Sequence, residues 1–413
     1  MARRPRVLAM IMAGGKGERL HPLTRERSKP AVPFGGRYRI IDFVLSNFLN
    51  SEMLSLYVLV QYKSQSLIEH LRLAWRTGGV VTDYFVTVVP PQMRFGTAWY
   101  RGTADAVLQN LNLVDDFAPD VVAIFGSDHI YRMDVNQMLT FHRESGADVT
   151  VAARRVPVGD ASPFGVLAVD RHARVSHFEE KPPEPQPLPD DPTQAFVSMG
   201  NYLFSRQALV DALLADARRS TEHDFGRSII PELVPTGRVF AYDFQDNEVP
   251  GIKPYEEPGY WRDVGTIESY WDAHMDLLGE SPRFDLDNRH WPIRTGLHPG
   301  PAARFIGSDV DNTHVAEGSL VKRATLRNSI LGRSVWVNEG AVIEDSIVMD
   351  FTTVGKGARL RRAIIDRFNI IAADTEIGFE PEIDRRRYHV DASGLVVVAR
   401  GGRREFLSGL DDF

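Results

Sequence analysis

Glycine and basic residues concentrate directly after the first apolar run of this chain of 413 residues. Gly14 and Gly15 follow the run "VLAMIMA". Five basic residues come within the next fourteen positions: Lys16, Arg19, Arg25, Arg27 and Lys29. Glycine N–H groups can face a phosphate, and Lys and Arg can neutralise it. The stretch contains neither G-x-x-x-x-G-K-[ST] nor G-x-G-x-x-G. It therefore predicts a phosphate-binding turn without a standard motif, and a tight turn with solvated charges is the alternative.

Two aspartates stand where a metal-binding carboxylate would meet a nucleotide. Asp128 follows the apolar run 121–126, and Asp263 lies in a turn before a helical pattern. One or two carboxylates together with substrate phosphates typically hold Mg²⁺, so the two predict a magnesium site. Taken singly, each aspartate is better explained as a helix cap. His129 is not expected to act as a base, because a phosphate that attacks phosphorus needs none.

Residues suited to a sugar phosphate occur further along the chain. Glu180 can accept sugar hydroxyls, and Lys181 is a point charge suited to a phosphate. Gly165 and Ser198 are expected near the same strand ends, and Tyr100 precedes a helix whose N-terminus can face an anion or a sugar. These residues predict a pocket, although the Glu–Lys pair alone is more often a surface pair.

The composition limits the classes of protein to be considered. The net charge of −7 argues against nucleic-acid binding through bulk charge, so an anion must meet a local basic cluster. No stretch reaches the roughly 18 apolar residues of a membrane span, and the absence of cysteine excludes disulfides and fits a reducing cytoplasm. The start "MARRPRVLAMIMA" is expected to form a buried strand, since a basic glycine turn follows it instead of a signal-peptide cleavage site.

Short apolar runs alternate with amphipathic segments over the first two thirds of the chain. Strands are expected at 7–13, 56–62, 121–126 and 148–156, and helices at 64–75, 103–114 and 135–144. This alternation predicts an α/β domain with a mostly parallel sheet, whose ligands lie at the carboxyl ends of the strands. The proline-rich segment 181–194 is expected to be an internal loop.

The pattern changes near residue 300. From Ser319 onward aliphatic residues recur six positions apart, as at Leu320 and Leu326 or at Val348, Val354 and Leu360. A six-residue period is typical of a hexapeptide β-helix, with a set of ordinary short strands as the alternative. We expect a catalytic domain over 1–282, a linker over 283–303, and a hexapeptide-repeat domain over 304–413 that serves regulation and oligomerisation.

These segments together resemble the sugar-nucleotide pyrophosphorylases, and among them the bacterial ADP-glucose pyrophosphorylases. The resemblance covers almost the whole chain and follows the order of the family's motifs. It rests on "AGGKGERLHPLT", "SKPAVPFGGRYRIIDFVLSN", "WYRGTADAV", "SDHIYRMD", "FEEKP", "SMGNYLF", "HDFGRSIIP", "YWRDVGT" and "WPIRT". It implies a Rossmann-like nucleotidyltransferase domain of the GT-A-like kind, followed by a left-handed parallel β-helix.

The resemblance also implies a reaction and a role for each candidate residue. ATP and α-D-glucose 1-phosphate would give ADP-glucose and pyrophosphate, in the service of glycogen synthesis. Mg²⁺ on Asp128 and Asp263 would bridge phosphates, while Arg19 clamps the leaving pyrophosphate and Lys29 lies near the β- and α-phosphates. Gly14 and Gly15 would contact the base and ribose, with Gln92 as a weaker base contact. The residues that would hold glucose 1-phosphate are Tyr100, Gly165, Glu180, Lys181 and Ser198.

Regulation is the point where the chain departs from the enterobacterial members. Glu26 replaces a lysine that helps to bind a phosphorylated sugar activator, and Met93 replaces a glutamine. Basic residues remain at Arg361 and Arg362. Those that we consider for an anionic effector are Arg25, Arg27, Arg385, Arg386 and Arg387, and solvated charge is the equally weighted alternative. The resemblance further suggests a homotetramer.

Three other functions stay open at this point. The same fold could use another nucleotide or sugar 1-phosphate, for example UTP. A non-catalytic regulatory subunit would have lost the metal aspartate or the basic clamp, and both are present. A hexapeptide acyltransferase would need a histidine base at a coil interface, for which His314 is the only candidate near the first coil.

Overall fold

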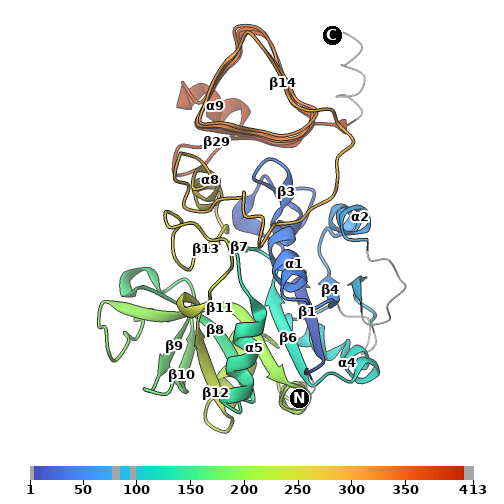
Figure 1. Ribbon diagram of the computed structural model, residues 1–413, viewed down its shortest axis with the longest axis vertical. Coiled ribbons are helices and arrows are strands. Elements are labelled where there is room, and N and C mark those ends of the chain that lie inside the picture. Colours follow the sequence, from blue (N-terminus) through green and yellow to red (C-terminus); the bar gives the residue numbers. More distant parts are fainter. Residues whose placement is uncertain (1–3, 77–83, 94–98, 404–413) are drawn as a thin grey trace.

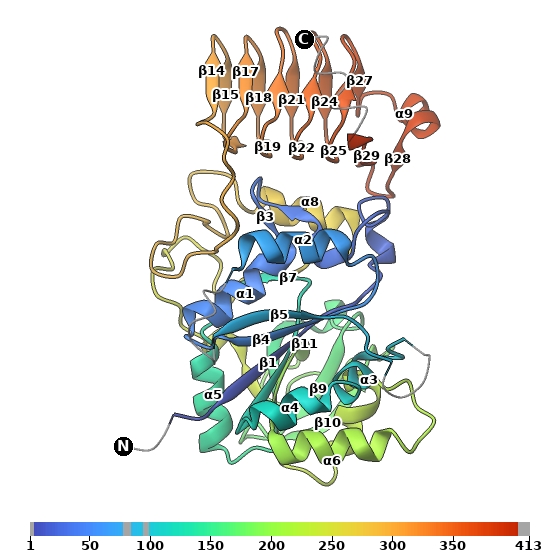
Figure 2. The same cartoon turned by 90° about the vertical axis from the view of Figure 1, so that its right-hand side faces the viewer.

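The computed structural model describes residues 4–76, 84–93 and 99–403. Figures 1 and 2 show two parts, an α/β part that carries the N-terminus and a stack of β-coils at the opposite end. The elements β3 (Tyr38–Arg39) and α8 (Ile267–Met275) lie between the central sheet and the coils. Among the described residues, no helix is both long and apolar enough to cross a membrane.

In the described part of the chain the central sheet has nine strands, and the four at one end of it are parallel. The strands β6 (Val121–Gly126), β1 (Val7–Ala13), β4 (Ser55–Val60) and β5 (Phe85–Val89) are neighbours and all run in the same direction. The predicted α/β fold with a mostly parallel sheet is therefore confirmed. Their carboxyl ends meet at one edge, where the residues that follow each strand are brought together.

An antiparallel extension flanks this parallel core. The strand β11 (Gln194–Ser205) runs antiparallel to β6, to β8 (Val149–Pro157) and to β9 (Gly165–Val169). A short turn joins β9 to β10 (Val175–Glu180), which allows only an antiparallel pair. The last strand, β12 (Val239–Asp243), is parallel to β8. The segment 181–193 contains no helix or strand, in agreement with the predicted loop.

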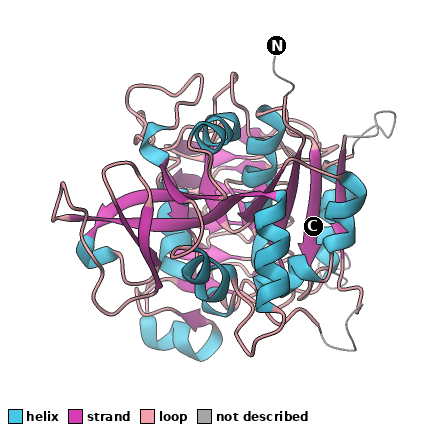
Figure 3. Ribbon diagram, turned by 90° about the horizontal axis from the view of Figure 1, so that it is seen from below, coloured by secondary structure: helices cyan, strands magenta, loops and turns pink. Residues whose placement is uncertain are grey.

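Helices cover both faces of the sheet, as the view along its edge in Figure 3 shows. They are α1 (Ile40–Asn50), α2 (Gln65–Ala74), α3 (Thr103–Leu108), α4 (Leu111–Phe117), α5 (Val135–Glu144), α6 (Arg206–Asp216) and α7 (Ile230–Leu233). The single helix expected over 103–114 was wrong, because the chain breaks into α3 and α4 there. The side-chain amide of Asn110, at the break, donates to the Tyr100 hydroxyl at 2.9 Å and to the Ala106 carbonyl at 2.8 Å. It thereby holds Tyr100, which lines the cleft described below.

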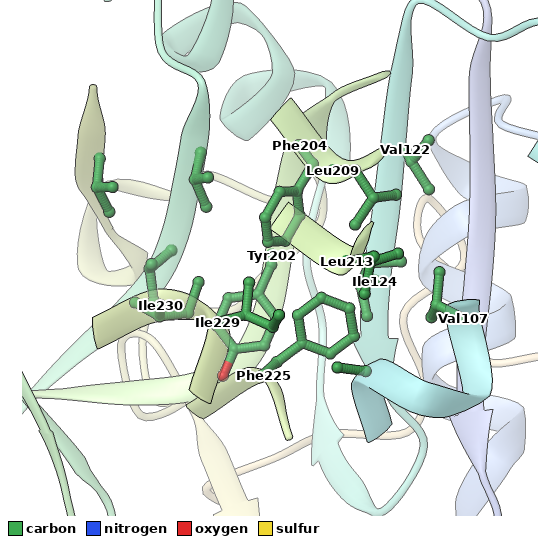
Figure 4. Packing of buried hydrophobic residues seen from close by; sticks show 14 of the residues in the cluster. Val107, Val122, Ile124, Tyr202, Phe204, Leu209, Leu213, Phe225, Ile229 and Ile230 are labelled. Carbon is green, nitrogen blue, oxygen red and sulfur yellow. The ribbon is translucent and has the colours of Figure 1, made fainter. Parts of the chain in front are cut away.

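Apolar side chains from β6, β11, α6 and the helical turn at 225–230, which is the π-helix Phe225–Ile229 and the start of α7, form one core on one face of the sheet. Phe204, Phe225 and Leu213 belong to one cluster of buried side chains, shown in Figure 4, which also includes Ile124 of β6. The ring centroids of Phe204 and Phe225 are 5.6 Å apart. This packing fixes α6 and the 225–230 turn against the sheet, and that turn forms part of the cleft described below.

The C-terminal part is a three-sided β-helix, whose triangular outline is seen in Figure 1. One face consists of β14 (Arg304–Ile306), β17 (Leu320–Lys322), β20 (Trp336–Val337), β23 (Thr353–Val354) and β26 (Ile370–Ile371). The second face consists of β15 (Asp309–Asp311), β18 (Thr325–Arg327), β21 (Val342–Glu344), β24 (Arg359–Arg361) and β27 (Glu376–Ile377). The third consists of β16 (His314–Val315), β19 (Ile330–Leu331), β22 (Ile347–Val348), β25 (Ala363–Ile365), β29 (Val396–Val398) and β28 (His389–Val390).

The registers of these faces explain the six-residue period of the sequence. Leu320 and Leu326 belong to β17 and β18, which are successive faces of one coil. Leu320 pairs with Trp336 and Trp336 with Thr353, so a full coil takes 16 or 17 residues. Every pair is parallel apart from β28–β29. The predicted β-helix of hexapeptide repeats is confirmed, while the helix α9 (Pro381–Arg387) between β27 and β28 was not predicted.

An apolar interface joins the β-helix to the α/β part. Ile330, Ile347 and Ile364 project from the third face into one cluster with Phe34 and Tyr270, and all five are buried. Removing such surface from water stabilises the contact by roughly 25 cal/mol per Å². The hydroxyl of Tyr270 donates to the Pro33 carbonyl. The interface therefore holds the coils in one position against the segment that follows the basic glycine turn.

Two adjacent leucines of α6 provide a test of the core in Figure 4. We expect Leu213→Ala to lower the free energy of unfolding by about 2–5 kcal/mol, because its side chain is 1% exposed and leaves a cavity. Leu214 is 44% exposed, so Leu214→Ala should change stability by no more than about 0.5 kcal/mol. The measurement is the midpoint of urea-induced unfolding. Equal losses in the two variants would contradict the packing.

Candidate active site

A cleft of about 830 Å³ opens at the carboxyl ends of the parallel strands. Most of the residues chosen from the sequence line this one cleft. They are Gly14, Gly15, Arg19, Lys29, Tyr100, Asp128, Gly165, Glu180, Lys181, Ser198 and Asp263. Gln92 is not among the lining residues, and its amide donates to the carbonyl of Pro90. The arrangement follows from the topology, because β1, β4 and β6 all end at this edge.

A small sheet brings the two aspartates together. The strands β7 (His129–Tyr131) and β13 (Trp261–Asp263) pair antiparallel, and Asp263 lies opposite His129. Asp128 directly precedes β7, so its carboxylate stands beside that of Asp263. Ligand atoms of Asp128, His129 and Asp263 all lie within 4.8 Å of one another. Two hard carboxylate donors suit Mg²⁺, which prefers oxygen ligands, so this donor set fits the metal that the sequence predicts.

Lys29 points at both carboxylates. Its Nζ lies 2.9 Å from Oδ2 of Asp128 and 2.8 Å from Oδ1 of Asp263, and its side chain is 8% exposed. Arg19 is more distant, with Nη2 at 3.9 Å from Oδ2 of Asp263 and a side chain that is 67% exposed. Of the two cations next to Asp263, Lys29 is thus buried and tightly paired, whereas Arg19 is exposed.

The electrostatics of this cluster favour its charged form. Burial alone would lower the pKa of Lys29, but Asp128 and Asp263 outweigh it and raise that pKa above its ordinary value. Burial alone would raise the pKa of Asp128, but the charge of Lys29, with a smaller effect of His129, holds that pKa well below its usual range. The ammonium and the carboxylate therefore both stay ionised at neutral pH.

The backbone around Lys29 is fixed by close packing. Lys29 opens the short 3₁₀ turn Lys29–Ala31, and Ser28 to Ala31 are all buried. Gly17 lies against it with a φ of 65°, and a Cβ at Gly17 would come within 2.9 Å of the Lys29 Cβ. The Thr24 hydroxyl donates to the Gly17 carbonyl at 2.8 Å. The glycine turn thus packs directly on the residue that holds the carboxylates.

The end of the cleft opposite the two aspartates is built from β10 and the turn after α6. Burial raises the pKa of Glu180, and Lys181 Nζ lies 3.9 Å from its Oε1. A Cβ at Gly165 or at Gly226 would come within 2.8 Å of Glu180 Oε2, so glycine at both positions leaves room for that carboxylate where it lies. The cleft therefore presents a carboxylate and an ammonium side by side.

Sequence reasoning missed several residues that line the cleft. Asp224 accepts hydrogen bonds from the Gly226 and Arg227 backbone and from the Thr103 hydroxyl at 2.8 Å, which ties the 225–230 turn to α3. Gln61 comes immediately after β4 and contacts the position of a Cβ at Gly14. The rule that ligands lie beyond the carboxyl ends of strands would have identified Gln61, and "HDFGRSIIP" contains Asp224.

The residues considered for an effector do not form one group. Arg27 is buried between the two parts of the molecule, where its Nη2 donates to Oδ2 of Asp366 at 2.5 Å. Arg25 is exposed on the same loop, and Glu26 accepts from Arg400 at 2.8 Å. Arg385, Arg386 and Arg387 are exposed on α9, where Arg385 pairs with Glu382. His314 lies in β16, the last strand of the first coil.

The two glycines of the basic turn differ in a way that can be tested. We expect Gly17→Ala to lower the free energy of unfolding by about 1–3 kcal/mol, since a side chain there combines a left-handed backbone with the contact on Lys29. Gly15→Ala should cost no more than about 0.5 kcal/mol, because a Cβ at Gly15 meets nothing within 4 Å. Thermal unfolding of both variants checks this. A Gly15 variant as unstable as the Gly17 variant would contradict the geometry.

Comparisons with known proteins agree with both parts of the fold. A family model described as nucleotidyl transferase matches residues 8–280, and one described as GlmU-like C-terminal hexapeptide matches residues 301–398. The chain is 52% identical to the glucose-1-phosphate adenylyltransferase of Thermodesulfovibrio yellowstonii, over 97% of each chain. It is 48% identical to the enzymes of that name from Photobacterium profundum, over 96% of this chain and 98% of the relative, and from Anaeromyxobacter sp., over 97% and 99%. The chain therefore belongs to the nucleotidyl transferase family and, within it, to the glucose-1-phosphate adenylyltransferases.

Proposed function

We propose that this protein transfers the adenylyl group of ATP to α-D-glucose 1-phosphate, giving ADP-glucose and pyrophosphate. One observation supports this most strongly. A single cleft joins a glycine turn with exposed Arg19, the carboxylates of Asp128 and Asp263, and the Glu180–Lys181 pair. Such a cleft suits two polyanionic substrates that must be held in line. We further propose that the product serves α-glucan synthesis.

The residues of the cleft divide the work of positioning. Gly14 and Gly15 give the nucleotide a close approach to the end of β1, with Gln61 beside Gly14. Arg19 can hold two oxygens of the leaving pyrophosphate, and Lys29 neutralises charge on the phosphates. These groups orient the sugar phosphate relative to the α-phosphorus of the nucleotide. Holding the two reactants in the right geometry removes much of the activation barrier to such a transfer.

The other end of the cleft holds the sugar. Glu180 accepts hydroxyl hydrogen bonds, and Lys181 pairs with the phosphate of glucose 1-phosphate. Tyr100, Gly165 and Ser198 complete the pocket. No general base is needed, because the attacking phosphate oxygen is already ionised at neutral pH.

We propose that the divalent metal expected in this family is Mg²⁺, held by Asp128 and Asp263. When bound, it would supply positive charge that is shared by the phosphates of the nucleotide and the leaving pyrophosphate. The carboxylate of Asp128, whose pKa is held well below its usual range by Lys29, needs no proton release to accept it.

The residues of the cleft bear on two alternative functions, a non-catalytic subunit and an enzyme that uses another nucleotide. A non-catalytic subunit would lack part of the carboxylate and basic set, whereas Asp128, Asp263, Lys29 and Lys181 all lie in the cleft. Another nucleotide, such as UTP, would fit the same phosphate-binding parts. The choice of base therefore decides between the proposed function and the second alternative.

Pyrophosphate release with different nucleotides tests the proposal. With Mg²⁺ and glucose 1-phosphate, we expect ATP to react at least about tenfold faster than UTP, dTTP or GTP, a discrimination of about 1.4 kcal/mol in the transition state. Asp128→Asn should lower the ATP rate by about 10²–10³, because it removes a group that stabilises charge in the transition state.

Two controls make this test decisive. The Asp128→Asn variant must keep the wild-type circular dichroism spectrum and melting temperature, which separates lost chemistry from lost fold. A near-normal rate in a folded Asp128→Asn variant would sink the assigned site. A preference for UTP would replace the adenylyl donor and leave the site assignment intact.

Regulation and assembly are further parts of the proposal. We propose that an anionic metabolite acts at the basic residues of the C-terminal part, among which Arg385, Arg386 and Arg387 are exposed. The homotetramer that the sequence resemblance implies, and the cytoplasmic location that fits the absence of cysteine, stay predictions.

Replacing the three arginines of α9 by alanine tests this regulatory role. We expect the shift in the ATP saturation curve produced by phosphorylated sugars or carboxylic acids to weaken at least about fivefold, with the unstimulated rate unchanged. A matched control replaces the equally exposed Arg323 at a corner of the β-helix. If every effector response survives the triple substitution, the proposed effector site is wrong.

A further inference from the structure

Given the proposed function, the position of Lys29 affects how the divalent metal reaches Asp128 and Asp263. Its Nζ lies 2.9 Å from Asp128 Oδ2 and 2.8 Å from Asp263 Oδ1. These are oxygens of the two carboxylates that would hold a divalent cation. An ammonium that donates to both carboxylates at once serves as their shared counter-ion.

A divalent cation and this ammonium compete for the same carboxylates. Like charges a few ångströms apart repel strongly in a partly buried site, where water screens them poorly. The side chain of Lys29 is 8% exposed, and those of Asp263 and Asp128 are 22% and 38% exposed, so solvent screens these charges only in part. The cation can therefore take both carboxylates only if the ammonium leaves them.

Only the side chain of Lys29 is free to make this move. Its backbone carbonyl accepts from the Val32 N–H at 3.0 Å, and Ser28 N–H donates to the Lys63 carbonyl at 3.3 Å. Two residues earlier, Arg27 is anchored to Asp366 of the β-helix. Gly17 packs directly against the Cα and Cβ of Lys29, so the backbone of Lys29 has no room to move toward the glycine turn. Rotation about the side-chain bonds moves the ammonium without disturbing any of these contacts.

The same cleft offers a destination for the ammonium. The glycine turn from Gly14 to Arg19 lines the cleft together with Lys29, and a triphosphate placed there would present anionic oxygens to Nζ. The nucleotide can thus accept the ammonium at the time the metal replaces it.

We propose that Lys29 is an exchangeable counter-ion that keeps a divalent cation off Asp128 and Asp263 until the phosphates of the nucleotide take its ammonium. Metal binding at the carboxylates is then coupled to nucleotide binding, and the coupling is reciprocal. The enzyme avoids a tightly held metal without substrate, and it brings metal and phosphates into the cleft together.

Mn²⁺ alone is the probe, measured by the loss of its free electron paramagnetic resonance signal on titration with the full-length protein. Without nucleotide, we expect Lys29→Met to bind Mn²⁺ about 5- to 150-fold more tightly than the wild type, a typical range of coupling between two sites. Lys29→Arg keeps the charge and should bind as weakly as the wild type. Arg19→Met is the matched control, because Arg19 also faces Asp263 but lies 3.9 Å away and 67% exposed, and it should change the affinity less than twofold.

Several outcomes would overturn the proposal. One is a Lys29→Met variant, folded by circular dichroism, whose affinity for Mn²⁺ equals that of the wild type. Another is tight Mn²⁺ binding to the wild type without nucleotide that disappears in Asp128→Asn, a result that does not depend on how well the Lys29 variants fold. In the Lys29→Met background, Asp128→Asn should abolish the gain, and a gain that persists would place the metal elsewhere.

Failure of the proposed function would look different. A protein that binds Mn²⁺ as expected but releases no pyrophosphate from ATP and glucose 1-phosphate would retain the exchange at Lys29 and lose only the assigned reaction.

Discussion

The contact of the Lys29 ammonium with two carboxylates is the interaction on which the rest of the cleft depends. It compensates Asp128 and Asp263, which would otherwise repel each other at the edge of the sheet. The β7–β13 pair sets the distance between the carboxylates, and the 3₁₀ turn at Lys29–Ala31 sets the place of the ammonium. The Gly17 turn packs on Lys29, so the glycine turn takes its position from the same cluster.

This cluster is connected to the β-helix through a very short stretch of chain. Arg27 and Lys29 are two residues apart, and the first is held by Asp366 in a buried ion pair whose side chains are 3% and 1% exposed. A buried pair of this kind is costly to break by removing one partner. The apolar interface of Ile347 and Tyr270 keeps the coils at this position. The hexapeptide part is thus a structural support for the cleft as well as a separate domain.

Much of this architecture could be predicted from the sequence because its signals are local. The period of six marks each face of the β-helix, and the parallel strands place Gly14 and Asp128 at one edge. What could not be predicted depends on contacts between distant segments. No local pattern in the sequence indicates the strand register that sets Asp263 beside Asp128. The same is true of the direction in which Lys29 points and of the ion pair that Arg27 forms with Asp366. Asn110 stands at the break between α3 and α4, and its side chain bonds to Tyr100, ten residues earlier.

A crystal structure with Mn²⁺ and a non-hydrolysable ATP analogue tests the central claim most directly. The account predicts an anomalous peak for manganese between Asp128 and Asp263, with the Lys29 Nζ turned away from both carboxylates and onto a phosphate. It also predicts that Arg27 and Asp366 stay paired, since only the side chain of Lys29 moves. A structure in which Lys29 still bridges the two carboxylates while the metal lies elsewhere would contradict the account.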